Sequence, residues 1–251
     1  MLFRSLPGID PLGPENILGF LPGILTGTGA LVASRFMVVA KSPLTGTIGD
    51  SNCGGHVGPE IKKAGYDGIF FTGVSEEPVY LYLTDDHAEL RDASKYWGKT
   101  TYETEDMLRE DLGEPKARIS CIGQAGEMQS LLASIVTERG NVAARSGLGA
   151  VMGSKKLKAL VVKGTKKIPV ANPDEMKAVK TKYMPFMKDG MAKLLRDYGS
   201  AAFYEGSVES CDAPIKNWGG VPSDYPTYTK VGAEAFKEIT TKKAPCAGCP
   251  V

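Results

Sequence analysis

The feature that most constrains the fold of this chain is the alternation of short β-branched and aromatic runs with glycine over residues 1–168. The chain has 30 glycines among 251 residues, and they concentrate in 19–73 and 140–153. Glycine weakens strand and helix interiors and favours turns, so runs of four to six strand-forming residues between glycines indicate short strands. The strands predicted in this way are Phe36–Ala40, Ile69–Thr72, Val79–Leu83, Ile119–Ile122 and Ala159–Lys163.

Helix start and stop signals lie between these runs and after them. A proline near the start and a glycine at the end predict a short helix over 58–65. A capping box predicts a helix over 100–113, and the sequence Asn-Pro-Asp-Glu begins another of about four turns over 172–190. From residue 171 onward the pattern is helix and loop. We therefore predict the α+β class, with a β-rich part followed by the beginning of a mainly helical part.

Charge and cysteine content exclude several classes of protein. A net charge of +1 gives no general attraction to nucleic acid or to anionic lipid. The sequence has no secretory signal and no apolar stretch near the roughly 20 residues that span a bilayer. Five cysteines are too few for a disulfide scaffold and are odd in number. We expect a cytoplasmic protein without nucleic-acid or membrane partners.

The first segment that carries chemistry spans residues 34–58. Here Arg35 precedes a stretch rich in small residues that contains Asn52 and Gly54. Backbone N–H groups of a glycine-rich turn that leads into a helix N-terminus at Gly58-Pro59 would form an anion site, and the guanidinium would add a charged hydrogen-bonding fork. The alternative is that the glycines only turn a hairpin and that Asn52 only occupies a left-handed backbone position.

The second segment spans residues 138–158 and has the same combination of arginine, glycines and a following helix. Arg139 and Arg145 precede a G-x-G sequence at Gly147 and Gly149, which leads into a predicted helix. It is neither a dinucleotide-binding fingerprint nor a Walker A loop. The alternative is that residues 154–158 form a solvated basic helix end and that the two glycines serve packing.

The third segment is the C-x-x-C of Cys246 and Cys249. Two thiolates at this spacing can bind one metal or one cluster from a single turn. Half of a zinc site, an iron–sulfur ligand pair and a structural role remain open, whereas a thioredoxin-type pair needs a βαβ context that is absent. Cys53, Cys121 and Cys211 stand alone. Since a cluster motif needs further cysteines, we expect this chain to be a fragment.

Seven motifs follow one another in a characteristic order. They are D-P-L-G-P-E-N at 10–16, K-S-P-L-T-G at 41–46, N-C-G-G at 52–55, A-G-Y-D at 64–67, R-D-A-S at 91–94, G-A-V-M-G-S-K at 149–155 and the terminal C-x-x-C. With these motifs the chain resembles the tungsten-containing aldehyde:ferredoxin oxidoreductase family from end to end. The resemblance implies that residues 1–168 form the family's pterin-binding N-terminal domain without its first strands, because Met1–Ser5 shows no strand signal. Residues 169–251 would be the truncated start of a helical, cluster-binding domain.

The resemblance also implies the cofactors and the reaction. The family binds tungsten, or sometimes molybdenum, between two pyranopterins whose phosphates are bridged by magnesium, beside a 4Fe-4S cluster. It oxidises aldehydes to carboxylic acids with ferredoxin as electron acceptor. We expect a homodimer or larger complex. Two alternatives remain: a tungsten subunit like that of benzoyl-CoA reductase, and a non-catalytic split or degenerate pterin-binding domain.

In the first segment, residues 34–58, the resemblance assigns a role to each of three residues. Arg35 would contact a pterin phosphate, Asn52 would bind pterin and magnesium, and Gly54 would offer its backbone. In the second segment, residues 138–158, the Val142 carbonyl would be the magnesium ligand opposite Asn52. Below we call this segment the second loop.

Further along the second loop, Ala144 and Arg145 would line the pterins and their phosphates. Asn141 departs from the family pattern, which usually has arginine there. This departure puts the affinity for the cofactor in doubt, because one charged phosphate contact is lost.

Cys246 and Cys249 match the first two cluster ligands of the family's C-x-x-C-x-x-x-C, and the third would fall beyond Val251. The family's carboxylate and histidine beside the metal match neither His56 nor His87, so we expect no catalytic residue in this chain. His56 could touch bound cofactor, although a histidine after two glycines is more often a local hydrogen-bonding or packing residue.

Overall fold

The computed structural model describes residues 8–85 and 87–251. Our expectation that Met1–Ser5 carries no strand therefore lies outside the described residues. The chain divides into two compact units, the first made of Met1–Ala171 with Cys246–Gly248, and the second of Asn172–Pro245 with Cys249–Val251. The family role that we assigned to each part of the chain stays a prediction.

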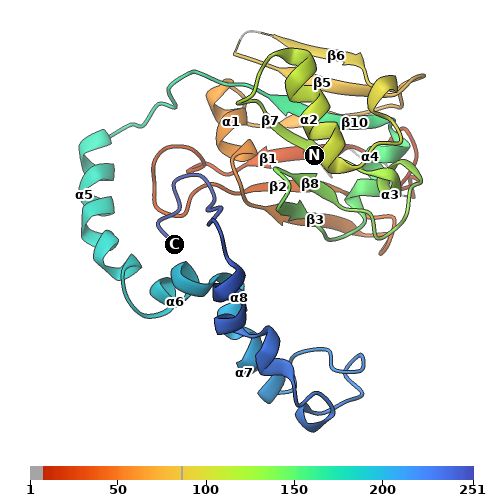
Figure 1. The fold of residues 1–251 in the computed structure, drawn as a ribbon. Coiled ribbons are helices and arrows are strands. Elements are labelled where there is room, and N and C mark those ends of the chain that lie inside the picture. Colours follow the sequence, from red (N-terminus) through yellow and green to blue (C-terminus); the bar gives the residue numbers. More distant parts are fainter. Residues whose placement is uncertain (1–7, 86) are drawn as a thin grey trace. The chain divides into compact units, whose positions relative to one another are not determined.

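The first unit contains two β-sheets (Figure 1). The four-stranded sheet has the order β3-β2-β1-β4 and is antiparallel throughout. Its strands are β1 (Leu18–Pro22), β2 (Phe36–Lys41), β3 (Ile48–Cys53) and β4 (Ile69–Phe71). A turn that includes Gly46, at φ +71°, joins β2 to β3.

The six-stranded sheet has the order β6-β5-β10-β7-β8-β9. Its strands are β5 (Val79–Leu83), β6 (Ala88–Asp92), β7 (Arg118–Cys121), β8 (Ile135–Thr137), β9 (Asn141–Ala143) and β10 (Leu157–Val162). The central strand β10 pairs in parallel with β5 and antiparallel with β7. An antiparallel sheet and a mixed sheet, packed with helices, confirm the predicted α+β class.

Helices of the first unit cover both faces of the six-stranded sheet. They are α1 (Val57–Lys63), α2 (Thr101–Leu112), α3 (Gln124–Glu127) and α4 (Leu148–Ser154), with a 3₁₀ turn at Ser94–Tyr96. Helices α1 and α4 contact strands of both sheets and bury one core between them, which includes Phe20, Phe36 and Leu160. Helix α2 covers the opposite face over Ile119 and Val161 (Figure 1).

The second unit is helical, as predicted. Its helices are α5 (Pro173–Tyr183), α6 (Gly190–Tyr198), α7 (Tyr204–Glu209) and α8 (Ala233–Ile239), with 3₁₀ turns at Met184–Met187, Gly199–Phe203, Pro222–Asp224 and Tyr228–Val231. The predicted helix over 172–190 begins as expected, with the Asn172 side chain accepting from Glu175 N–H, but it ends early at Tyr183. Pro185 has no N–H to continue the α-helix, and the chain tightens into a 3₁₀ turn. None of the described helices is long and apolar enough to cross a membrane.

All five predicted strands form, to within two residues at either end, and so do the helices predicted over 58–65 and 100–113. The helix predicted after the G-x-G sequence also forms, as α4. Strands β1, β3, β6, β8 and β9 were not predicted. Strand β3 shows why. Its sequence Ile-Gly-Asp-Ser-Asn-Cys is poor in strand formers, and our interpretation of residues 50–53 as part of the glycine-rich turn is wrong. Six cross-strand pairs with β2, from Phe36 opposite Cys53 to Lys41 opposite Ile48, override that local propensity. The turn itself forms at 54–56 and leads into α1 as predicted.

Candidate cofactor-binding site

Asn52 lies on the outward face of the four-stranded sheet. Along β3 the residues Gly49, Ser51 and Cys53 are buried and their neighbours are exposed, so Asn52 points away from the core. It pairs across the strands with Met37, and its Nδ2 donates to the Met37 sulfur at 2.9 Å. Arg35 donates from its guanidinium to Asn52 Oδ1. The alternative that Asn52 occupies a left-handed turn position is therefore wrong.

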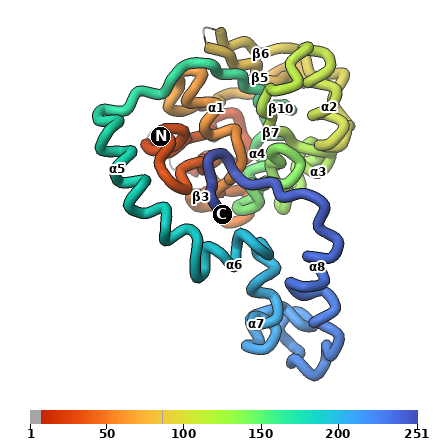
Figure 2. Tube along the Cα trace, turned by 60° about the vertical axis from the view of Figure 1, so that its left-hand side comes forward, coloured from red at the N-terminus to blue at the C-terminus, as the bar shows by residue number. Residues whose placement is uncertain are grey.

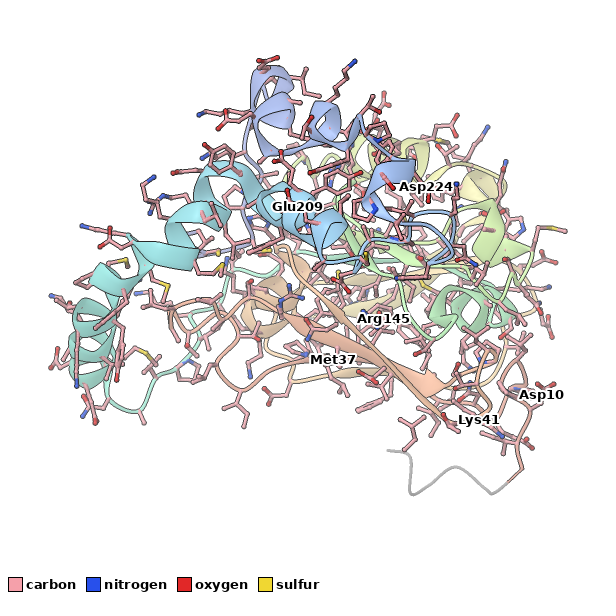
Figure 3. The ribbon with its side chains drawn as sticks, turned by 90° about the horizontal axis from the view of Figure 1, so that it is seen from below. Asp10, Met37, Lys41, Arg145, Glu209 and Asp224 are labelled. Atoms are coloured by element: carbon pink, nitrogen blue, oxygen red, sulfur yellow. The ribbon has the colours of Figure 1, made fainter. Side chains whose placement is uncertain are left out.

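The second loop meets β3 close to Asn52. The Arg145 N–H donates to Ser51 Oγ at 3.1 Å, although 94 residues separate the two in sequence. Ser146 Oγ donates to the Asp50 carbonyl at 3.3 Å, and the Ser146 carbonyl accepts from Ser42 Oγ at 2.8 Å. Figure 3 looks onto this face, with Met37 and Arg145 labelled. The fold thus brings the Arg35 side chain to Asn52 and the Arg145 backbone to the neighbouring residue Ser51, which faces the core.

Val142 and Ala144 belong to the edge of the other sheet. Val142 lies in β9, opposite Val136, and its side chain is 38% exposed. Ala143 is buried and Ala144 is exposed, as alternation in a strand requires. Since β3 and β9 are each the last strand of a sheet and contact each other, the candidate site lies where two sheet edges meet.

Among residues 8–85 and 87–251, no carboxylate forms an ion pair with Arg35 or Arg145. Both side chains are exposed. Arg139 is different, because it pairs with Asp106 and lies over the Tyr102 ring at 5.4 Å, on the side of α2. The arginines at 35 and 145 can therefore offer charged donors to an anionic ligand such as a phosphate.

The glycine at 54 permits a close packing contact. A Cβ there would lie 2.7 Å from Cys246 Sγ and 3.3 Å from Asn141 Oδ1. Ala247 N–H donates to the Gly55 carbonyl at 3.2 Å, so the Cys246–Gly248 segment packs on this glycine pair within the first unit. No sequence pattern predicted that Cys246 and Asn141 are neighbours.

Our expectation of an anion site at the N-terminus of the first predicted helix is wrong, because the protein fills that position itself. The His56 N–H at the start of α1 donates to Glu138 Oε2 at 2.6 Å, and Arg118 donates to Glu138 Oε1 at 2.6 Å. The first residues of the helix, Val57 and Gly58, are buried. His56 Nδ1 also lies 3.2 Å from Glu138 Oε2, which supports its local hydrogen-bonding interpretation. Glu138 carried no sequence signal for this role.

For the second loop, the alternative was that its glycines serve packing and that residues 154–158 form a solvated basic helix end. The first part is confirmed for Gly149 and the second part is wrong. Gly149 is a packing glycine, because a Cβ there would lie 2.7 Å from the Ala133 carbonyl. The basic end is not solvated, since Lys155 and Lys158 are 4% and 0% exposed. Lys158 forms a buried ion pair with Glu127 and donates to the Lys99 carbonyl.

Within the described part of the chain Lys155 forms no ion pair, and it donates to the carbonyls of Gly73 and Pro14, at 3.1 and 3.5 Å. Burial lowers the pKa of Lys155 to about 8. These two lysines hold the loop to the core and do not face the candidate site.

The cysteines differ in their surroundings. Burial raises the pKa of Cys53 to about 11 and that of Cys121 to about 12, so both thiols stay protonated and behave as packing residues. Cys246 is half-buried beside Asn141, and Cys249 lines an open pocket of the second unit. In the described part of the chain, no group of three or more histidine, cysteine, aspartate or glutamate side chains is placed to hold a metal.

The fold and the site define an α+β domain in which the edge strands of two sheets meet and two exposed guanidiniums lie in the segments beside them. The family model of the aldehyde ferredoxin oxidoreductase N-terminal domain matches residues 1–164, and the chain belongs to that family.

The tungsten-containing aldehyde ferredoxin oxidoreductases of Thermococcus kodakarensis and Pyrococcus furiosus are each 41% identical to this chain over 254 aligned positions, which cover 98% of it. The aliphatic sulfonate oxidoreductase, WOR-like subunit, of Pyrococcus furiosus is 34% identical over 97% of the chain. The active-site complex BamBC of benzoyl-coenzyme A reductase with 1,5-dienoyl-CoA superposes on all of the chain with a TM-score of 0.82 and 33% identity. The chain spans about 40% of the length of these proteins.

Proposed function

We propose that this chain is the cofactor-binding part of a tungsten oxidoreductase that oxidises aldehydes to carboxylic acids and passes the electrons to ferredoxin. The observation that carries the proposal is that two segments 94 residues apart meet at β3, where Arg35 donates to Asn52, the Arg145 N–H donates to Ser51, and both guanidiniums are exposed. Similarity to the tungsten-containing aldehyde ferredoxin oxidoreductases along almost the whole chain supports it.

These residues fit the phosphates of a bis-pyranopterin that carries tungsten or molybdenum. Arg35 and Arg145 would each bind a phosphate through charged hydrogen bonds. Asn52 and the Val142 carbonyl supply oxygen donors, which are the ligands that magnesium prefers, so they would hold the ion between the phosphates.

Two further residues would complete the contact. Gly54 would offer its backbone to the cofactor beside the Cys246 sulfur, which fills the space of its missing side chain, and the small side chain of exposed Ala144 would leave room for the pterin. When bound, the metal–pterin group supplies the two-electron redox chemistry, and this chain binds and orients it.

Cys246 and Cys249 would be the first two ligands of the 4Fe-4S cluster, which needs two more cysteines. We place the protein in the reducing cytoplasm, because its five cysteines are too few for a disulfide scaffold. The working enzyme would be a homodimer or larger complex, with an aldehyde substrate and ferredoxin as partners.

A second candidate is the dearomatising reduction performed with benzoyl-CoA. The benzoyl-coenzyme A reductase complex, which superposes on the whole chain, favours it. Both candidates share the pterin-binding face, so they differ in substrate and not in the residues considered above. Assaying the enzyme that contains this chain with short aldehydes and with 1,5-dienoyl-CoA, against a viologen dye, separates them by which substrate reduces the dye.

The binding role is tested by tungsten content. We expect Arg35→Ala and Arg145→Ala, made in the enzyme that contains this chain, each to lose most of the tungsten measured by mass spectrometry, because each removes one charged phosphate contact. Arg139→Ala is the matched control, since that guanidinium pairs with Asp106, and it should keep its tungsten. Unchanged tungsten in both of the first two variants would refute this placement, and a wild-type protein without tungsten or pterin would favour a non-catalytic domain.

A further inference from the structure

Asn141 contacts Cys246, one of the two predicted cluster ligands. The Cys246 thiol donates to Asn141 Oδ1 at 3.8 Å, a hydrogen-bond distance for sulfur. Both residues belong to the first compact unit, although 105 positions separate them. Asn141 begins β9 and pairs with Thr137, so its backbone is fixed by the sheet.

Two glycines give this contact its room. A Cβ at Gly54 would lie 2.7 Å from Cys246 Sγ, and one at Gly55 would lie 2.9 Å from Asn141 Nδ2. Gly55 is also at φ +90°, where a side chain is strained. The Gly54–Gly55 pair therefore allows the amide and the sulfur to lie against the same stretch of backbone.

A thiolate bound to iron has lost its proton and can only accept a hydrogen bond. The oxygen of Asn141 then has nothing to accept from the sulfur. A half-turn about the terminal torsion of the side chain exchanges Oδ1 with Nδ2, and the two orientations fill nearly the same space. The amide can thus become the donor to the same sulfur without a change in the backbone.

We propose that Asn141 is a positioning residue that donates a hydrogen bond from Nδ2 to the cluster-bound Cys246 sulfur and raises the reduction potential of the cluster. One-electron reduction adds negative charge to the cluster and its sulfurs, and a donor at a sulfur stabilises that charge. Hydrogen bonds to the sulfurs are among the features that set cluster potentials. The inference rests on the 4Fe-4S cluster of the proposed function.

The test is a redox titration of the holoenzyme that contains this chain, with dithionite as reductant and the reduced cluster followed by electron paramagnetic resonance. Asn141→Leu keeps the size of the side chain and removes the donor. We expect the equilibrium between reduced and oxidised cluster to shift about fivefold to tenfold toward the oxidised form. A tenfold shift is a fall in potential of about 59 mV for a one-electron couple.

Two variants separate this effect from a general disturbance. Asn141→Gln keeps an amide and should restore part of the potential. Asn172→Leu makes the same replacement at the exposed N-cap of α5 in the second unit and should leave the potential unchanged.

The outcomes distinguish a failure of the proposed function from a failure of the inference on Asn141. A wild-type holoenzyme without a cluster signal would overturn the proposed function and this inference with it. A normal cluster signal with equal potentials in wild type and Asn141→Leu would overturn this inference alone. If Asn141→Leu fails to fold, equal potentials in Asn141→Asp and wild type overturn it, because the acid replaces the donor with a negative charge.

Discussion

Close approaches between backbone segments decide several residue identities in this protein. Gly153 in α4 is the strongest case, because a Cβ there would lie 1.8 Å from the Gly126 carbonyl oxygen of α3. The two short helices lie side by side (Figures 1 and 2). A side chain at this position cannot be accommodated unless the helices separate.

We therefore expect Gly153→Ala to lower the free energy of unfolding of the first unit by about 3 kcal/mol or more, through overpacking. Urea unfolding followed by Trp97 fluorescence, in a Trp218→Phe background, would measure it. Gly140→Ala is the matched control, because no atom lies within 4 Å of its added Cβ. Equal losses in the two variants would contradict the packing argument.

The buried Lys155 makes the stability of the first unit depend on pH. Its folded pKa of about 8 lies below its ordinary value of 10.5, so between these pH values the unfolded chain binds more protons than the folded one. The free energy of unfolding therefore rises with pH across that window. Below pH 8 the buried Lys155 is charged, and its full destabilising effect is present.

We expect the free energy of unfolding of the wild-type chain, relative to Lys155→Met, to increase by up to about 3 kcal/mol from pH 8 to pH 10.5. The same Trp97 fluorescence measurement at several pH values would follow the difference. A difference independent of pH would mean that Lys155 titrates at its ordinary value in the folded protein.

At the scale of elements, local signals and tertiary pairing act together. Helix α2 is specified by its own ends, since Thr100 accepts from Glu103 N–H, the Glu103 carboxylate accepts from Thr100 N–H, and Gly113 closes the helix at φ +63°. Strand β10 is the opposite case. All six of its residues are buried, because helices cover both faces of its sheet, and so it lacks the alternation of a half-exposed strand.

Thr100→Ala should destabilise the first unit by about 1 kcal/mol through loss of the cap, whereas Thr100→Ser should be close to neutral. Urea unfolding in the Trp218→Phe background measures both. A loss of similar size in the serine variant would show that the threonine methyl group matters more than the cap.

At the scale of the whole molecule, the two predicted cluster cysteines fall into different compact units, Cys246 in the first and Cys249 in the second. They supply two thiolates, and a 4Fe-4S cluster takes four cysteines. Cluster assembly would thus depend on groups beyond these two residues.

We accordingly expect purified residues 1–251 to hold no stoichiometric iron and sulfide after anaerobic reconstitution, and to oxidise no aldehyde with a viologen acceptor. Iron, sulfide and turnover assays check this directly. Four irons per chain with a reducible cluster signal, or any aldehyde turnover, would contradict the expectation.

The sequence by itself determined the α+β class, five strands, the caps of α2 and the family, because each rests on local patterns or on motif order. The sequence also predicted Arg35, Asn52 and Arg145 as candidate cofactor-binding residues. Only the tertiary structure decided that β3 is a strand, that Glu138 fills the start of α1, that Lys155 and Lys158 are buried, and that Asn141 meets Cys246. The physical reason is that these features depend on contacts between residues far apart in the chain, which local propensity does not encode.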